Sequence, residues 1–109
     1  MNWLAHILLS ENNIQFQLGN YLADPLKGRV WPNVSNDLKN GMYVHKIIDT
    51  YTDKHPIFIQ SKNRLKKNAL LRGIIVDITY DYLLTKNWNK FCNIPKKIFT
   101  NDFNEKAKQ

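Results

Sequence analysis

Residues 70–82, with the sequence LLRGIIVDITYDY, indicate the fold class of this chain. Their large apolar residues recur at intervals of three and four, which is the spacing of one face of an α-helix and not the alternation of a β-strand. Ile47, Ile48 and Tyr51 follow the same spacing, as does most of the remaining sequence. We therefore expect an all-α protein of about five to six helices.

Capping residues and prolines divide the chain into the expected helices. Ser10 is a typical N-cap, and the helix that follows it should end near residues 19–24, before Pro25. Ser35 or Asn36 can cap a helix that runs to about residue 51, and the proline after His55 suits the first position of another. Two further helices should cover residues 69–86 and 95–106, and residues 25–36 should form turns.

Size and composition set further limits. With 109 residues the chain is long enough for one core, so residues 1–109 should form a single domain. The net charge of +7 favours acidic partners. A single cysteine, Cys92, excludes an internal disulfide framework and agrees with the cytoplasm as the compartment. We expect no membrane insertion, because no apolar run approaches the roughly 20 residues that span a bilayer and the N-terminus is a poor signal peptide.

Acidic residues and histidines share the helical spacing. His45, Asp49 and Asp53 lie four residues apart, so each step turns only about 40° around the helix axis and the three side chains share one face. Asp77 and Asp81 repeat this spacing on a second expected helix. Apolar residues beside them in sequence must face the core, so these acids should lie at its border.

An unpaired carboxylate near a core is costly, so it tends to shift its pKa or to bind a cation. Where several carboxylates and an imidazole converge, a divalent metal is the simplest such cation. A mixed His/Asp set suits manganese, iron, magnesium or zinc better than a calcium loop does. The ordinary alternative is a solvated helix face on which the acids pair with Lys46, Lys54 or Arg72. A lone His6 is more often a core or capping residue than a ligand, and His55 can be a turn residue. The spacing alone therefore permits a metal site without proving one.

Four ordered blocks of sequence resemble the acyl carrier protein phosphodiesterase family. They are MNWLAH at residues 1–6, LGNYLAD at 18–24 followed by Lys27-Gly28, GMYVHKIIDTYTDKHP at 41–56 and DITYDY at 77–82. The third block, with its His-x-x-x-Asp-x-x-x-Asp-x-His-Pro pattern, is the most specific. One departure is Tyr82, at a position where many relatives have histidine.

The resemblance implies a helical fold distantly similar to the HD-type metal phosphohydrolases. It also implies hydrolysis of the phosphodiester that joins 4′-phosphopantetheine to a serine of holo acyl carrier protein. The divalent cation, Mn²⁺ first and Mg²⁺ or Fe²⁺ as alternatives, would polarise phosphoryl oxygens and acidify a water. Asp53 or His55 would orient this water or protonate the leaving serine oxygen. The implied metal ligands are a subset of His6, Asp24, His45, Asp49, Asp77 and Asp81.

Basic residues have a use in the same interpretation, because acyl carrier proteins are small and acidic. The basic residues between 62 and 67, together with Arg72, would form a face complementary to the acidic carrier protein and so speed the encounter of the two proteins. A solvated helix face is the simpler explanation of any single lysine among them. Two other basic residues, beside the Asp24 block, are better placed to contact phosphate. The expected substrate contacts are Lys27 and Arg29 at the phosphate and Lys62, Arg64, Lys66, Lys67 and Arg72 on the basic face.

Family members usually continue well beyond this length. The chain therefore looks like the N-terminal part of the family domain, or a shortened member without its C-terminal helices, and uncovered apolar faces would favour a homo-oligomer. Three other functions stay open: an inactive remnant that binds carrier protein or only folds, a phosphohydrolase of a nucleotide or another phosphodiester, and a basic nucleic-acid-binding module. No recognised nucleic-acid motif accompanies the charge, so nucleic acid is the least favoured partner.

Overall fold

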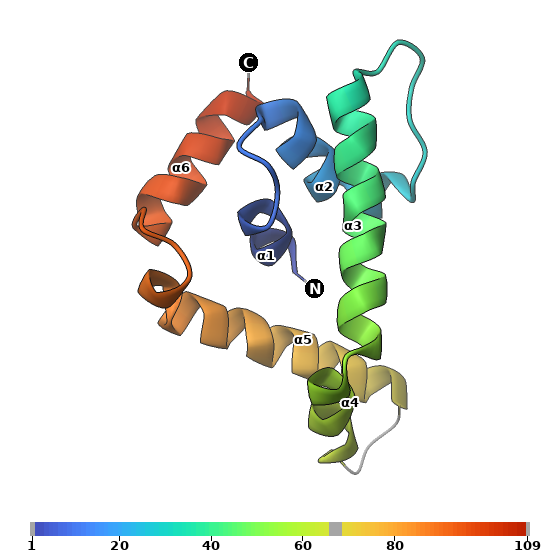
Figure 1. Ribbon diagram of the computed structural model, residues 1–109, viewed down its shortest axis with the longest axis vertical. Helices are drawn as coiled ribbons and strands as arrows, with labels where there is room; N and C mark the ends of the chain where they lie inside the picture. The colour runs from blue at the N-terminus through green and yellow to red at the C-terminus, as the bar shows by residue number, and fades with distance from the viewer. Residues whose placement is uncertain (1, 66–68, 109) are drawn as a thin grey trace.

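The computed structural model describes residues 2–65 and 69–108, and these residues form helices and turns without a β-strand (Figure 1). The expectation of an all-α protein is therefore confirmed. A short 3-10 helix, η1 (Trp88–Lys90), precedes the last α-helix. Two residues expected to contact substrate, Lys66 and Lys67, lie outside the described residues. The α-helices are α1 (Trp3–Leu8), α2 (Ile14–Leu26), α3 (Asn36–Lys54), α4 (Pro56–Asn63), α5 (Ala69–Lys86) and α6 (Lys96–Ala107).

Side-chain caps fix the helix starts, although not always at the expected residue. Ser35 caps α3 and α4 begins at Pro56, both as expected, and the side chain of His55 caps α4. The expectation that Ser10 caps α2 is wrong, because Asn13 accepts two N–H groups of the first turn instead. The same helix also includes Pro25, where we expected it to have ended. A proline so close to the C-terminal end removes only one backbone hydrogen bond, so the last turn tolerates it.

The close pairing of α2 with α3 is the main packing contact of the molecule. Two glycines make it close, since a methyl group on Gly19 would clash with the backbone of Leu38 and one on Gly41 would clash with the backbone of Phe16. Beside these crossings a small core forms, in which Leu38 is almost fully buried. Because glycine has no side chain, the backbones of α2 and α3 come into direct contact at these two positions, and this contact fixes how the two helices pack.

The short helix α1 lies at the centre of the molecule, with α2, α3, α5 and α6 around it (Figure 1). Leu4 and Ile7 of α1 are buried, which holds the helix in place despite its six residues. The Cα extents are 45 × 32 × 18 Å, so the ring of helices is a thin layer. The radius of gyration of 15.0 Å exceeds the roughly 13 Å typical of a compact chain of this length.

The second half of the chain packs less closely than the first. Helix α5 leaves Ile74, Ile78 and Tyr82 exposed at successive turns, and α6 is seated by Phe103 and contacts α2. Among the described residues, helices of sufficient length lack the apolar character needed to cross a bilayer. The fold thus consists of a packed unit, α1–α3, and a more open arm, α4–α6.

Candidate metal centre

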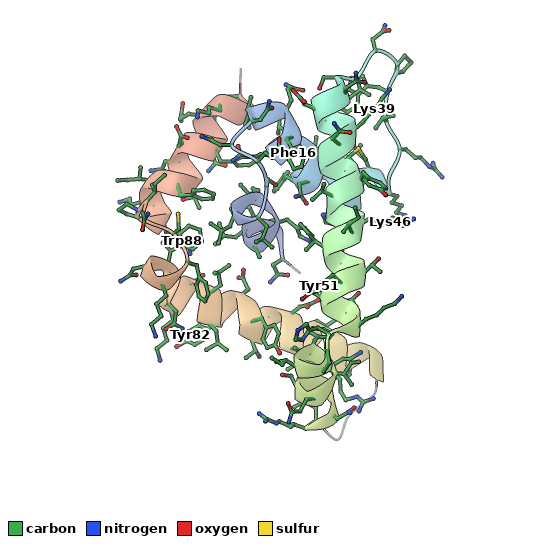
Figure 2. All side chains as sticks on the ribbon, in the orientation of Figure 1. Phe16, Lys39, Lys46, Tyr51, Tyr82 and Trp88 are labelled. Carbon is green, nitrogen blue, oxygen red and sulfur yellow. The ribbon has the colours of Figure 1, made fainter. Side chains whose placement is uncertain are left out.

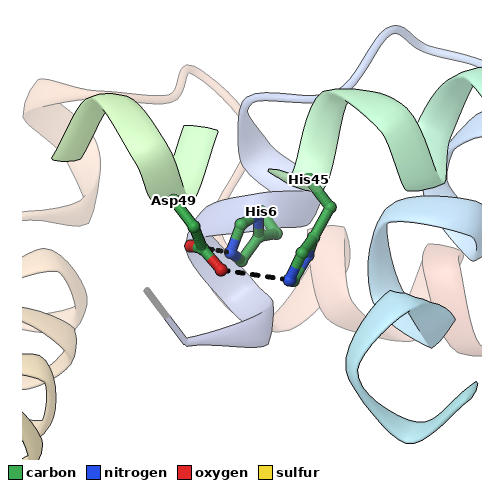
Figure 3. A group of neighbouring side chains, drawn as sticks. All are labelled: His6, His45 and Asp49. Atoms are coloured by element: carbon green, nitrogen blue, oxygen red, sulfur yellow. Dashed lines mark hydrogen bonds and ion pairs between the residues drawn. The ribbon is translucent and has the colours of Figure 1, made fainter. Parts of the chain in front are cut away.

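A cluster of imidazole and carboxylate groups lies between α1 and α3 (Figure 3). His6 Nε2 lies 3.0 Å from Asp49 Oδ1, and His45 Nε2 lies 3.2 Å from Asp49 Oδ2. The two imidazole rings stack at 3.8 Å between centroids. Potential ligand atoms of the three residues all lie within 4.8 Å of one another. One carboxylate therefore joins a histidine from each helix at a single point.

The hydrogen bonds of His45 define its protonation at one nitrogen. Nδ1 lies 2.8 Å from the backbone oxygen of Asn20, and a carbonyl oxygen can only accept, so Nδ1 carries a hydrogen and donates it. Nε2 faces two carboxylates, Asp24 at 3.1 Å and Asp49 at 3.2 Å. Carboxylates at both contacts require either a second proton on the ring or a cation between the groups. The arrangement is typical of metal-binding histidines, whose second nitrogen is held by a carbonyl.

Asn20 organises this cluster from α2, and our sequence interpretation assigned it no role. Its fully buried side-chain amide donates to the backbone carbonyl of His6 at 3.1 Å and to Ser10 Oγ at 2.7 Å. The Ser10 hydroxyl donates to the same His6 carbonyl at 2.7 Å. Asn20 thus contacts both His6 and His45. The only sequence signal for it was its place in the LGNYLAD block, between Gly19 and Asp24.

The histidines of the cluster differ in their surroundings. His6 is fully buried, and its Nδ1 has no hydrogen-bond partner among the described residues. Asp24 is the opposite case, because 74% of its side chain is exposed although it contacts His45. The buried side of the site is therefore made of imidazoles and the open side of carboxylates. A cation and an anionic ligand would both approach from the open side.

The pKa values of Asp49 on α3 and Asp77 on α5 are shifted in opposite directions. Burial acts upward on the pKa of Asp49, but the hydrogen bond of His6, the positive charge of the N-terminus and the charge of His6 together outweigh it and lower the pKa to about 2. The pKa of Asp77 is raised, first by burial and then by the charges of Asp53 and Asp49. Asp77 thus belongs to the same electrostatic environment as the cluster. Its backbone oxygen also accepts from the Asn2 side chain at 3.5 Å, which places it beside α1.

Four other predicted site residues lie outside the group formed by His6, His45 and Asp49. Asp77 and Asp81 both line an apolar pocket of about 240 Å³ between α1 and α5. Asp53 is exposed on the last turn of α3. His55 uses Nδ1 to accept the N–H of Ile57 at 3.1 Å, so the structure shows it as a helix cap. The cluster that contains His6, His45 and Asp49, with Asp24 in contact, is the part that the structure brings together.

The predicted basic contacts are scattered over several elements. Lys27 ends α2 in the left-handed conformation and is exposed, as is Arg29 after it. Lys62 lies over the Phe58 ring on α4, where its charge gains a cation–π contact at 5.3 Å. Arg64 is exposed, whereas the Nε of Arg72 is buried. Lys62 and Arg64 lie at the C-terminal end of α4 and Arg72 lies on α5, so the expected basic face stays a prediction.

Sequence comparison identifies the family. The profile of the family described as acyl carrier protein phosphodiesterase matches residues 1–109. The chain belongs to this family. An acyl carrier protein phosphodiesterase of Photorhabdus laumondii is 37% identical over 92 residues, and the match covers 83% of this chain and 46% of the relative.

Two other relatives with the same name support the assignment to the acyl carrier protein phosphodiesterase family. That of Yersinia enterocolitica is 30% identical over 99 residues, covering 87% of this chain and 51% of the relative. That of Salmonella agona is 29% identical over 91 residues, covering 83% and 47%. The chain thus spans about half the length of these relatives. No solved structure matches it, so the similarity to HD-type phosphohydrolases stays a prediction.

Proposed function

We propose that this chain carries a divalent-cation site that hydrolyses the phosphodiester between 4′-phosphopantetheine and the serine of holo acyl carrier protein. The observation that supports this most strongly is His45. Its Nδ1 donates to Asn20 while its Nε2 faces two carboxylates. A divalent cation satisfies this donor set without an additional proton. Membership in the acyl carrier protein phosphodiesterase family supports the substrate.

The proposed ligands are His6, His45, Asp49 and Asp24, because they form the described cluster. Asp77 is a further candidate, since a cation would relieve the repulsion from Asp49 that raises its pKa. Two imidazoles with carboxylates suit Mn²⁺ or Fe²⁺, and Mg²⁺ is less favoured because it prefers oxygen ligands. When bound, such a cation supplies Lewis-acid polarisation of phosphoryl oxygens and a more acidic water.

The chain's own residues hold and position the reacting groups. Asn20 fixes the orientation of the His45 ring and the backbone of His6. Asp53 and His55, at the end of α3, are proposed to orient the attacking water or to protonate the leaving serine oxygen. Because His55 Nδ1 accepts the N–H of Ile57, the neutral ring carries its hydrogen on Nε2. We propose Nε2 as the donor atom in that role, and Asp81 as a more remote contributor from α5.

Intact mass spectrometry tests this function directly. Purified holo acyl carrier protein is incubated with the chain and Mn²⁺, and a parallel sample contains a chelator. We expect the mass of the carrier protein to fall by that of the phosphopantetheine group only in the sample with metal. Unchanged mass with folded, metal-loaded protein would contradict the proposal. Hydrolysis of a nucleotide phosphodiester under the same conditions would instead favour a different phosphohydrolase.

A further inference from the structure

Helix α3 has a second face with exposed apolar side chains, distinct from the one that carries His45 and Asp49. Tyr43, Ile47 and Tyr51 lie one turn apart, with 66%, 48% and 67% of their surfaces exposed. Together with Lys46 and Thr50 they line a groove of about 460 Å³. Large apolar side chains exposed to this extent in a row are typical of an interaction surface.

Three lysines accompany this groove along the same helix. Lys39, Lys46 and Lys54 are exposed (Figure 2 labels the first two and Tyr51), and none forms an ion pair with another described residue. At about 100° per residue, Lys39 and Lys46 lie within about 20° of each other around the helix axis, and Lys54 lies about 80° further round, beside the row of Tyr43, Ile47 and Tyr51. We define the docking stripe as Lys39, Tyr43, Lys46, Ile47, Tyr51 and Lys54.

The docking stripe adjoins the candidate metal centre. Lys46 follows His45 directly in sequence and precedes Asp49 by three residues, which is less than one helical turn. The metal-facing and stripe-facing sides of α3 therefore share an edge. A partner that lies along the stripe would hold its own side chains within reach of the cluster.

We propose that the docking stripe binds an acidic helix of the protein substrate, with its apolar side chains in the groove and its carboxylates on the lysines. This inference rests on the proposed function, in which that substrate is acyl carrier protein. Tyr43, Ile47 and Tyr51 form an apolar row, and Lys46 lines the same groove on the side of the metal-facing residues. An apolar row with positive charge along its edge matches an amphipathic acidic helix better than a flat lipid surface. Two copies of the chain fit poorly, because a symmetric contact would bring like-charged lysines together on a protein of net charge +7.

Equilibrium binding in a chelator tests the stripe without turnover. Fluorescently labelled holo acyl carrier protein is titrated with the wild-type chain, with the double variant Lys39→Glu/Lys46→Glu and with Lys97→Glu. Lys97 is an exposed lysine of α6, and this helix lies on the opposite side of the molecule from α3 in Figure 1. We expect the double variant to bind about tenfold or more weakly and the α6 variant to bind within about twofold of wild type. Tyr43→Ala should weaken binding without any change of charge.

The outcomes separate the docking stripe from the catalytic proposal. Wild-type release of phosphopantetheine with an unchanged KM in the double variant would overturn the stripe and leave the function intact. Stripe-dependent binding without release would keep the stripe and contradict the function. Equal weakening by Lys97→Glu, or no binding by the wild type, would overturn the stripe. So would a dimer that Tyr43→Ala dissociates, or equally stripe-dependent binding to vesicles of anionic phosphatidylglycerol.

Discussion

The packed unit α1–α3 and the arm α4–α6 differ in how closely their helices pack and in how much of their side chains they bury. In the packed unit, Gly19 and Gly41 bring two backbones together, and the side chains of His6, Asn20 and His45 are buried between helices. In the arm, α5 leaves apolar side chains exposed at successive turns, and a methyl group on Gly73 would meet nothing within 4 Å. The candidate metal centre lies on the rigidly packed side, where side chains can be held in position.

The largest expected effect comes from Asp49→Asn, which removes the group that joins the histidines of α1 and α3. We expect Mn²⁺ affinity to fall by more than about 100-fold and turnover to be lost, while helicity stays near wild type. Asp102→Asn on α6, which breaks only an exposed pair with Lys106, serves as the control and should change neither. Calorimetric titration with Mn²⁺ measures the affinity, and wild-type affinity in Asp49→Asn would remove this residue from the site.

A pair of glycine substitutions compares the packing of the two regions directly. Gly41→Ala should lower the free energy of unfolding by about 3 kcal/mol, because its methyl group meets the backbone of Phe16, which cannot move aside easily. Gly73→Ala should instead raise it by about 0.5–1 kcal/mol, since the site is open and alanine favours a helix. Urea denaturation measures both values. Similar effects from the two variants would mean that the regions do not differ in packing.

Asn20→Ala should affect the site and the fold together. The change deletes the donor to the His6 carbonyl and leaves that buried oxygen dependent on Ser10. We expect a loss of about 1–3 kcal/mol in stability and a decrease in Mn²⁺ affinity of about tenfold. Asn104→Ala, at an exposed position on α6, is the matched control. Thermal unfolding with and without Mn²⁺ distinguishes the two contributions, and an effect equal to that of the control would contradict the role of Asn20.

Asp77→Asn should stabilise the metal-free protein at neutral pH. The pKa of Asp77 is raised on folding, so the native state binds its proton more tightly, and stability falls as pH rises through the native pKa. Asparagine removes this cost above that pKa, and the difference between variant and wild type should vanish below pH 3.8. Thermal melts in a chelator across this range provide the measurement. If Asp77 is a ligand, added Mn²⁺ should make the wild type more stable than Asp77→Asn at neutral pH.

The smallest expected effect is the contribution of Asp49 to acid stability. Its pKa falls from 3.8 to about 2 on folding, so its stabilising contribution is complete above pH 3.8 and is lost as pH falls to about 2. In metal-free Asp49→Asn, this part of the pH dependence should be absent. An acid titration followed by circular dichroism compares the two proteins, and superimposable curves would contradict the contribution.

The sequence allowed most of the helices to be predicted, since periodicity and capping are local. The expected helix at residues 69–86 matches α5, Ser35 caps α3 as expected, and α4 begins at Pro56 as expected. Two predictions about α2 were wrong. Asn13 caps this helix instead of Ser10, because the Ser10 hydroxyl donates to the backbone carbonyl of His6 in α1, and the helix continues through Pro25 instead of ending before it. α1 itself is short and depends on burial, which periodicity in six residues cannot show.

The candidate site was predictable only within single helices. Spacing placed His45 and Asp49 on one face, which their shared contact reproduces. The contact between His6 and Asp49 joins residues 43 positions apart, and the packing of α1 alone determines it. Asn20 could not be assigned, because asparagine is common in this chain and its role depends on which carbonyls surround it.

The short length of α1 should control how fast the candidate metal centre exchanges a cation. A helix of six residues does not persist alone, so His6 is held in place only while Leu4 and Ile7 stay docked. Local opening of α1 would remove one imidazole and leave the remaining ligands on α2 and α3. The rate at which a bound cation exchanges with solvent should therefore follow the fraying of the N-terminal helix, and amide hydrogen exchange in α1 should slow when the site is filled.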